Sequence, residues 1–287
     1  MNAKKVIVFG PTGKVGSATA LAAQQHGAKA DLTKPETIRA AVTKTGAKHA
    51  FIYMSFGPPE ETRSAVETLK AAGVEFVVYL SSLSVQGDTT SIPPSEIIPW
   101  LHAQGEIALA NLFGADGYAA VRPGVFVSNL LQYKDAIAAG VVKVPSPGAN
   151  CDYISPEDIG SVCGAVLAKG SLALDRQKTD KNAIYLCGPR RISQRDAIQL
   201  IGKAVDKDVT VEDFADEEEA VENITKGLGL PEVGARYLWK GMKDLEETDS
   251  MYKNIDYEEA VANVQKYGGK VATDIQDWVE TNKAKFI

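Results

Sequence analysis

The segment Val6-Ile7-Val8-Phe9-Gly10-Pro11-Thr12-Gly13-Lys14-Val15-Gly16 decides the fold. It consists of an apolar strand that runs into a glycine-containing turn, and the alanine-rich stretch from Lys14 to Gln25 then predicts a helix. Proteins hold nucleotide phosphates in this setting, because glycines let the backbone approach the phosphate and a helix N-terminus offers N–H donors. The spacing is GxxGxxG, and the GxxxxGK[ST] pattern of ATP-binding loops is absent, so a dinucleotide is favoured over ATP. An ordinary strand-to-helix turn is the alternative.

The composition of the 287 residues is that of a globular protein, with 45% apolar and 24% charged side chains. A net charge of −6 and a pI near 5.3 argue against direct binding of nucleic acid or of an anionic membrane, since both need a basic face. No apolar stretch approaches about 18 residues and no signal-peptide pattern opens the chain, so we expect a cytoplasmic protein. Three widely spaced cysteines, Cys151, Cys163 and Cys187, predict buried thiols, and we find no metal-ligand pattern.

Strands and helices alternate along the first part of the chain. Continuous apolar strands such as Val6–Phe9 and Phe76–Leu80 are typical of a parallel sheet that helices cover on both faces. We therefore expect a doubly wound α/β fold in residues 1–150 and a smaller, mixed α+β lobe in residues 151–287, with some strands returning to the sheet. The expected strands are 4–9, 29–32, 50–54, 76–80, 118–122, 183–187 and 209–214. The expected helices are 14–25, 35–45, 60–72, 99–113, 156–169 with Ser155 as its N-cap, and 194–205, with mostly helix from 215 to 287.

The first half of the expected sheet is short of one strand-helix unit. Only forty residues, Gly10 to His49, separate the first strand from the strand at Ala50–Met54, and they hold two helices and one short strand. The missing unit would fall between Gly27 and Ala28. Either the protein has lost it or this version of the sequence omits it. We favour the omission, because loss of an interior strand leaves backbone groups unpaired.

A series of further motifs follows the glycine turn, namely Asp31–Glu36, Tyr79–Ser82, His102–Glu106, Arg122–Phe126 with Asn129, and Ile154–Ile159. Their order and spacing resemble the NmrA-like branch of the atypical short-chain dehydrogenase/reductase superfamily. The resemblance implies a Rossmann-like NAD(P)-binding domain with a smaller C-terminal lobe for a substrate or partner. Some members of the family are reductases, and others bind the dinucleotide and act as redox-sensing regulators.

The resemblance also implies where the cofactor lies. NADP(H) is favoured and NAD(H) is possible, with the nicotinamide near the ends of the later strands. The expected cofactor contacts are Gly10, Thr12, Gly13, Lys14, Val15, Gly16, Asp31, Leu32, Met54, Ser55, Phe56, Leu80, Ser81, His102, Pro123, Gly124, Val125 and Phe126.

The catalytic residues depart from the superfamily pattern. Proton-relaying members carry a Tyr-x-x-x-Lys pair, and alignment on Glu106 puts Ile98 at the Tyr position and His102 at the Lys position. Ile98 cannot donate a proton. We therefore expect catalysis to use His102, as a general acid or a ribose contact, together with Ser81 and Ser82, which stand where the superfamily has a catalytic Ser or Thr. A structural histidine and two ordinary turn serines are the alternatives.

These features predict an NAD(P)H-dependent reductase or isomerase that acts on a small, largely apolar carbonyl or polyol compound. The alternative, which the absent tyrosine supports, is a dinucleotide sensor that binds a protein partner and performs no chemistry. A direct contact with nucleic acid or with a membrane is expected in neither case.

Overall fold

The computed structural model describes residues 5–23, 31–55, 57–175, 177–178 and 180–287, and its contacts divide the chain into two compact units. Unit 1 comprises Met1–Pro123, Pro156–Leu186 and Glu258–Val271, and unit 2 comprises Gly124–Ser155, Cys187–Tyr257 and Ala272–Ile287. Both units are thus assembled from segments on either side of residue 150.

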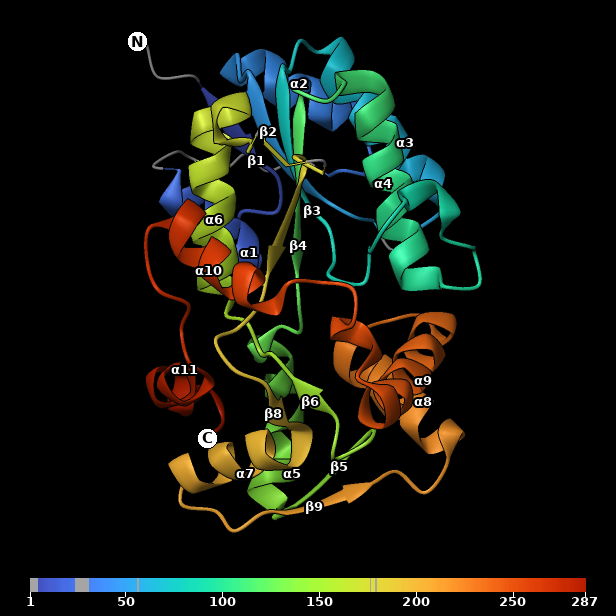
Figure 1. Ribbon diagram of the computed structural model, residues 1–287, viewed down its shortest axis with the longest axis vertical. Helices are drawn as coiled ribbons and strands as arrows, with labels where there is room; N and C mark the ends of the chain where they lie inside the picture. Colours follow the sequence, from blue (N-terminus) through green and yellow to red (C-terminus); the bar gives the residue numbers. More distant parts are fainter. Residues whose placement is uncertain (1–4, 24–30, 56, 176, 179) are drawn as a thin grey trace. The chain divides into compact units, whose positions relative to one another are not determined.

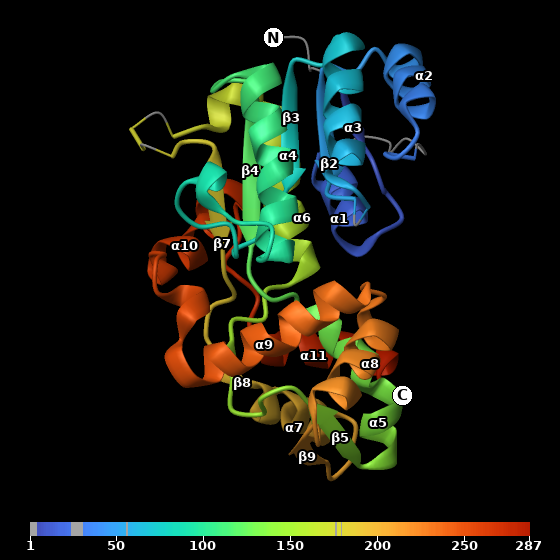
Figure 2. The same cartoon turned by 90° about the vertical axis from the view of Figure 1, so that its right-hand side faces the viewer.

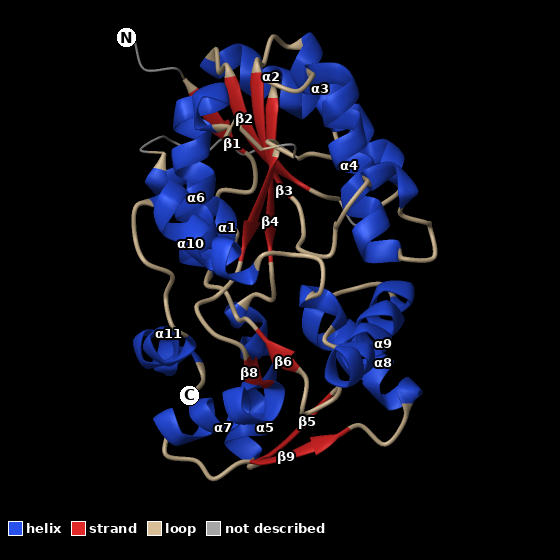
Figure 3. Cartoon of the chain, in the orientation of Figure 1, coloured by secondary structure: helices blue, strands red, loops and turns tan. Residues whose placement is uncertain are grey.

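Unit 1 is built on a five-stranded, wholly parallel sheet of order β1-β2-β3-β4-β7 (Figures 1 and 3). Neighbouring strands pair in the registers Ile7↔Ala50, Ala50↔Val77, Val78↔Ala119 and Val121↔Ile184. The parallel sheet confirms the predicted α/β class. The strands are β1 (Val6–Val8), β2 (His49–Tyr53), β3 (Phe76–Leu80), β4 (Tyr118–Pro123) and β7 (Ala183–Leu186).

Helices cover both faces of this sheet (Figure 2). Helices α3 and α4 pack together on one face, with α2 beside α3, and α1 packs against α6 on the other. Gly160 of α6 allows this close approach, since a Cβ there would lie 2.3 Å from the Cβ of Ala18. The helices of unit 1 are α1 (Lys14–Ala22), α2 (Pro35–Thr45), α3 (Pro59–Ala71), α4 (Ile97–Phe113), α6 (Pro156–Lys169) and most of α10 (Tyr257–Gly268).

The main core of unit 1 lies between the sheet and helices α2, α3 and α4. It buries alternate residues of the strands, such as Ile7, Ile52 and Val77, against Ile38 of α2 and Leu69 of α3, all at most 1% exposed. Burial of this apolar surface is the dominant favourable term for the fold. Because the strands are parallel, the carboxyl ends of β1, β2, β3 and β4 lie at one edge of the sheet, where α/β proteins bind ligands.

The first strand lies at an end of this sheet. In the part of the chain that the structure describes, β1 pairs with β2 alone, whereas the first strand of a doubly wound sheet is normally flanked on both sides. Of the strand expected at 29–32, the structure describes Asp31 and Leu32. These two residues lie in a turn and not in a strand. Lys29, like Gln25 and Gly27, lies outside the described residues. Among the described residues, the short interval noted in the sequence thus corresponds to a sheet in which no strand lies beyond β1.

Unit 2 is smaller and mixes short strands with helices. Its strands β5 (Val141–Val144) and β9 (Thr210–Asp213) pair in parallel, and β6 (Asn150–Cys151) and β8 (Ile192–Ser193) pair antiparallel. Helix α11 buries Ile275, Trp278 and Val279, as its amphipathic pattern predicts. The helices are α5 (Lys134–Ala139), α7 (Gln194–Ala204), α8 (Glu217–Leu228), α9 (Glu232–Thr248) and α11 (Ile275–Asn282).

The three cysteines are buried free thiols, as predicted. Within the described ranges, no helix combines the length and the apolar character that a bilayer crossing needs. The same residues contain no group of three or more histidine, cysteine, aspartate or glutamate side chains arranged to hold a metal ion.

Candidate dinucleotide-binding site

The three glycines of the turn between β1 and α1 have different structural roles. Gly10 has a φ of +64°, which glycine adopts without strain, and its carbonyl accepts a 3.0 Å hydrogen bond from the Gly13 N–H. A Cβ on Gly16 would lie 2.1 Å from that carbonyl oxygen, so the turn closes against α1 only with glycine there. Gly13, in contrast, has an ordinary φ of −77°, and a Cβ there would meet only the Gly10 oxygen, at 3.4 Å. Neither conformation nor packing in the described chain requires a glycine at position 13.

Helix α1 begins directly behind this turn without a side-chain cap. Its N-cap residue is Gly13, and no acidic side chain occupies its first turn. An uncapped helix N-terminus carries a partial positive charge and is a ready site for an anion. Thr12, Gly13 and Lys14 are exposed at this point, whereas Val15 and Gly16 are buried. The exposed residues of this turn that an anion can reach are therefore Thr12, Gly13 and Lys14.

Asp31 lies in the turn that precedes α2, and its carboxylate is held by neighbouring residues. Its carboxylate accepts hydrogen bonds from the backbone N–H of Thr33 at 3.0 Å and from the Thr33 hydroxyl at 2.7 Å, and Lys34 Nζ lies 3.4 Å away. The bonds from Thr33 and the charge of Lys34 lower the pKa of Asp31. Leu32 is buried in the core beneath this turn. Asp31 therefore presents an exposed carboxylate, and Leu32 anchors it.

The loop after β2 is tied to helix α3. Ser55 donates a 2.5 Å hydrogen bond to Oε2 of Glu61, and its Oγ accepts one of 3.2 Å from the backbone of Gly57. Met54 is buried at 5% exposure. Phe56, the third predicted contact of this loop, lies outside the described residues. The hydrogen bonds of Ser55 therefore hold this loop against α3.

The end of β3 meets a buried ion pair. Ser81 donates a 2.5 Å hydrogen bond to Oε1 of Glu106, and the same carboxylate accepts bonds from Arg122 Nε at 3.0 Å and Nη2 at 2.5 Å. Arg122 and Glu106 are 2% and 3% exposed. Burial opposes the charge on Arg122, but Glu106 more than offsets it, so the pKa of the guanidinium is raised. The pair fastens α4 to the carboxyl ends of β3 and β4, and it occupies the Ser81 hydroxyl.

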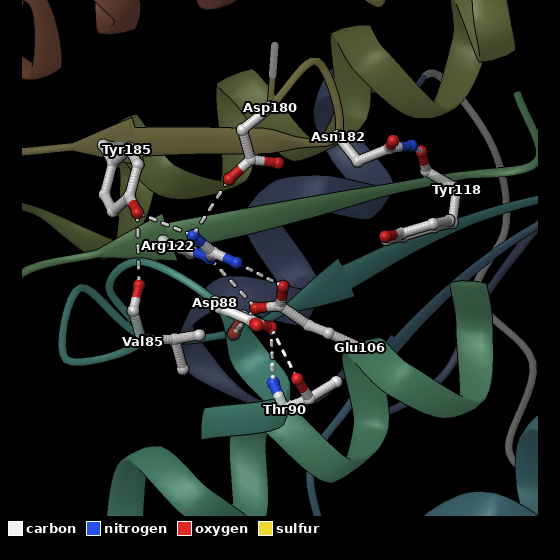
Figure 4. A network of polar contacts seen from close by, with 10 residues as sticks. Val85, Asp88, Thr90, Glu106, Tyr118, Arg122, Asp180, Asn182 and Tyr185 are labelled. Carbon is white, nitrogen blue, oxygen red and sulfur yellow. Dashed lines mark hydrogen bonds and ion pairs between the residues drawn. The ribbon is translucent and has the colours of Figure 1, made fainter. Parts of the chain in front are cut away.

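Arg122 also reaches strand β7 (Figure 4). Its Nη1 donates to the hydroxyl of Tyr185 at 2.6 Å and lies 3.4 Å from Oδ2 of Asp180, and Tyr185 donates to the carbonyl of Val85 at 3.2 Å. The network therefore joins β4, β7, α4 and the loop after β3. A buried network of this kind orders the carboxyl edge of the sheet when all its members are paired.

The two neighbouring serines have different surroundings. Ser81 is 3% exposed and bound to Glu106, whereas Ser82 is only partly buried. The Ser82 hydroxyl exchanges a 2.8 Å hydrogen bond with the Ser84 hydroxyl and accepts one from the Ser84 N–H. Ser82 therefore has the more accessible hydroxyl of the two at the end of β3.

His102 is a partly buried residue of α4. Its ring lies 6.3 Å from the ring of Tyr79, and neither His102 Nδ1 nor the Tyr79 hydroxyl, both inaccessible to solvent, has a hydrogen-bond partner among the described residues. Burial lowers the pKa of His102 from its ordinary value of 6.5 to about 4. At this pKa the imidazole is neutral near pH 7, a state in which the ring exchanges hydrogen bonds and is a weaker general acid than an imidazolium.

This lowered pKa predicts an acid-sensitive stability. A histidine with a lower pKa in the folded chain stabilises the fold fully above its unfolded pKa of about 6.5 and loses that contribution as the pH falls toward about 4. We expect His102→Phe to lose less unfolding free energy between pH 7 and pH 5 than the parent, as measured by urea denaturation. Equal losses in the two proteins would show that His102 does not titrate in this way.

The predicted contacts after Pro123 belong to unit 2 and are held by one buried carboxylate. Asp152, 1% exposed, accepts hydrogen bonds from the N–H of Val125 at 2.9 Å, from that of Gly188 at 3.0 Å and from the hydroxyl of Tyr252 at 2.8 Å. A Cβ on Gly124 would lie 2.3 Å from this carboxylate. Burial raises the pKa of Asp152. Phe126 follows in a bridge to Ile154.

Comparison with known proteins agrees with this architecture. No family model matches the chain. It is, however, 35% identical over 318 aligned residues to the nitrogen metabolite regulation-like protein bik4 of Gibberella fujikuroi, with 96% of this chain and 95% of the relative covered. The chain belongs to the NmrA-like family. The resemblance of its motifs to that family is thereby confirmed.

Other proteins that this NmrA-like chain resembles carry the names of reductases. An NAD(P)H azoreductase of Xenophilus azovorans is 26% identical over 208 residues, which cover 71% of this chain and 66% of the relative. An NADPH complex of the quinone oxidoreductase QOR2 of Escherichia coli has a TM-score of 0.70 at 17% identity and covers 96% of this chain and 99% of its own. The NADP(H) complex of a Citrobacter triphenylmethane reductase has a TM-score of 0.69 at 14% identity, with the same coverage of 96% and 99%. These structures share the fold.

The alignment with the Gibberella relative is longer than this chain. It spans 318 residues, more than the 287 of this chain, so the relative carries residues that have no counterpart here.

Three features of the site were not predicted from the sequence. They are the ion pair of Arg122 with Glu106, the carboxylate of Asp152 and the exposed ring of Tyr53. A signal existed for the first, because Glu106 and Arg122 are isolated charges in otherwise apolar segments, and buried charges require partners. No comparable signal joins Asp152 to Tyr252, which lies 100 residues away in the sequence.

Proposed function

We propose that the chain binds NADP(H) or NAD(H) through unit 1, with the pyrophosphate over Gly13 at the N-terminus of α1. One observation carries this proposal: glycine stands at position 13 although the fold needs none there, whereas Gly10 and Gly16 are explained by the turn itself. Because glycine has no side chain, it leaves room for a phosphate at an uncapped helix N-terminus. Solved structures of the same fold that contain NADPH or NADP(H) support the proposal.

We favour NADP(H) over NAD(H) for this chain. Both of those structures contain the 2′-phosphorylated dinucleotide. The exposed Lys14 beside the turn is a candidate to pair with the negative charge of the 2′-phosphate. Thermal shifts with NADPH and NADH compare the two preferences directly, since a ligand that binds only the folded chain raises its stability with concentration.

The reaction that fits best is reduction of a small, largely apolar carbonyl compound such as a quinone. Bound NADPH would supply the hydride. The chain's own contribution is then to orient the substrate and to stabilise the oxygen that gains negative charge. Ser82 suits that stabilisation better than Ser81, whose hydroxyl is bound to Glu106, and better than His102, whose ring lies against Tyr79.

This assignment gives a turnover prediction. NADPH oxidation is followed by absorbance with a panel of quinones and azo dyes as acceptors. Ser82→Ala should lower kcat by about a hundredfold, the effect of removing one oxyanion donor, with NADPH affinity unchanged. His102→Phe is the matched control and should keep its turnover. A Ser82→Ala variant with parental kcat would overturn the assignment of Ser82.

A sensor without chemistry is the second candidate, and Ile98 favours it. Ile98 lies in the first turn of α4, at the position of the superfamily's proton-donating tyrosine, and its side chain is only partly buried. The same assay separates the candidates. Firm binding of NADPH without oxidation by any acceptor would support a regulator that responds to the dinucleotide and binds a protein partner.

A further inference from the structure

Tyr185 lies beside Arg122 on the neighbouring strand of the sheet. The two residues are paired in register between β4 and β7, so their side chains project from the same face. The Cζ atom of Arg122 lies 5.2 Å from the centre of the Tyr185 ring. The carbonyl of Tyr185 accepts a 3.1 Å hydrogen bond from the Asn263 side chain of α10. Both the backbone and the ring of Tyr185 are therefore held in place.

The hydroxyl of Tyr185 joins Arg122 to the loop after β3 (Figure 4). It accepts a 2.6 Å hydrogen bond from Arg122 Nη1 and donates one of 3.2 Å to the carbonyl of Val85. Because a guanidinium donates hydrogen bonds and accepts none, the proton of the hydroxyl is left for Val85. Burial raises the pKa of Tyr185, so the phenol keeps that proton near neutral pH.

Val85 closes the turn that carries Ser82. Its N–H donates a 3.1 Å hydrogen bond to the carbonyl of Ser82, and its side chain is fully buried. Inside the turn, the N–H of Ser84 donates to the Ser82 hydroxyl at 3.2 Å, and the two hydroxyls share a bond of 2.8 Å. The direction of the Ser82 hydroxyl therefore depends on the shape of this turn.

Strand β4 holds the other end of the turn. The N–H of Ser81 donates to the carbonyl of Val121 at 2.8 Å, and the N–H of Leu83 donates to that of Pro123 at 2.9 Å. These bonds continue the pairing of β3 with β4 on both sides of Ser82. The turn is thus tied to β4 where it begins and to β7 where it ends.

The contacts of Tyr185 connect the buried ion pair with the accessible serine. Glu106 holds Arg122 through both carboxylate oxygens, Arg122 holds the Tyr185 hydroxyl, and that hydroxyl holds the far end of the turn. We propose, resting on the proposed function, that Tyr185 is a positioning residue. Through the Val85 carbonyl, its hydroxyl holds the turn so that the Ser82 hydroxyl meets the acceptor oxygen that gains negative charge.

Loss of the Tyr185 hydroxyl should slow the reaction without removing a reacting group. Tyr185→Phe keeps the ring beside Arg122 and removes both bonds of the hydroxyl. Since a displacement of about 1 Å can cost about a hundredfold in rate, we expect kcat to fall about tenfold. This loss stays below the effect of about a hundredfold expected for Ser82→Ala. The affinity for NADPH should stay the same, because β7 and β1 lie at opposite ends of the sheet.

A double-mutant cycle tests whether Tyr185 acts through Ser82. NADPH oxidation with the best quinone acceptor is measured for the parent, Tyr185→Phe, Ser82→Ala and the double variant. The double variant should have the kcat of Ser82→Ala, because the turn then has no hydroxyl left to position. Tyr267→Phe removes a hydroxyl outside this network, from the partly buried ring of Tyr267 on α10, and should keep the parental kcat.

Amide hydrogen exchange measures the tie without any turnover. In Tyr185→Phe, the amides of residues 83–85 should exchange about 2- to 10-fold faster than in the parent, which corresponds to one lost hydrogen bond. They should exchange at the parental rate in Tyr267→Phe. A urea midpoint of Tyr185→Phe close to that of the parent establishes that the fold is kept.

The outcomes that contradict the proposal differ from those that contradict the proposed function. Parental kcat in Tyr185→Phe, or losses that multiply in the double variant, would refute the positioning role and leave the reductase assignment standing. Unchanged exchange of residues 83–85 in Tyr185→Phe would refute the tie itself. A parent that binds NADPH and reduces no acceptor would overturn the proposed reaction and the role of Tyr185 together.

Discussion

Replacing Glu106 with alanine should cost the protein about 3–5 kcal/mol of unfolding free energy. Glu106 and Arg122 are almost wholly buried, and the carboxylate is bound at both oxygens by the guanidinium. Its removal leaves a buried cation whose remaining charged partner is Asp180, at 3.4 Å and largely exposed. The hydroxyl of Ser81 loses its acceptor as well. Urea denaturation at pH 7 measures the loss.

Two variants make this prediction specific. Glu106→Gln keeps oxygen and shape but not the charge, and its loss of stability should be smaller than that of Glu106→Ala. Glu222→Ala removes the exposed partner of Lys226 on α8, and it should change stability far less, because solvated ion pairs contribute little. Equal effects of Glu106→Ala and Glu222→Ala would contradict the assignment of the buried pair as the fastening of α4 to β3 and β4.

Gly13→Val should abolish cofactor stabilisation and leave the fold intact. In the parent, NADPH at a hundred times its Kd should add about 2.7 kcal/mol of stability. The valine would fill the space over the helix N-terminus, yet it meets no atom of the described chain closer than 3.4 Å at its Cβ. Its unfolding midpoint without cofactor should therefore match the parent's in a thermal-shift assay.

Gly16→Val is the matched contrast to Gly13→Val. Its Cβ would lie 2.1 Å from a backbone oxygen, so this variant should be destabilised before any cofactor is added. If Gly13→Val were as unstable as Gly16→Val, glycine 13 would be a structural requirement. The observation that carries the dinucleotide proposal would then be lost.

Much of unit 1 could be predicted from local sequence. The apolar runs give β1 to β4 within one or two residues, and the glycine pattern places the start of α1 at Lys14. These features depend on neighbours in the chain, which a sequence displays directly. The helix at 97–113 begins two residues earlier than expected, because Pro99 is tolerated in the first turn of a helix.

The parts that could not be predicted depend on distant residues. Strand 29–32 was expected from composition, but Asp31 and Leu32 lie in a turn fixed by Thr33. The carboxylate of Asp152 holds Val125, Gly188 and Tyr252, which only the folded chain brings together. The difference between Ser81 and Ser82 likewise comes from Glu106, a residue of another element.

The orientation of His102 is the clearest example within the site. Position in the family motif suggests a residue that meets the cofactor, and the helical period alone does not say which way it points. In the folded chain its ring faces Tyr79, and burial lowers its pKa to about 4. A chemical role for this histidine would show as lost turnover in His102→Phe, whereas the role proposed for Ser82 predicts unchanged turnover in that variant.

The most direct test of the central claim is calorimetric titration of the purified chain with NADPH. The glycine turn, the uncapped start of α1 and the open face of Gly13 predict a single saturable site that is absent in Gly13→Val. Saturable binding by the parent and none by the variant is the expected result. No heat of binding with NADPH or NADH up to millimolar concentration, or equal binding by the parent and Gly13→Val, would contradict the account.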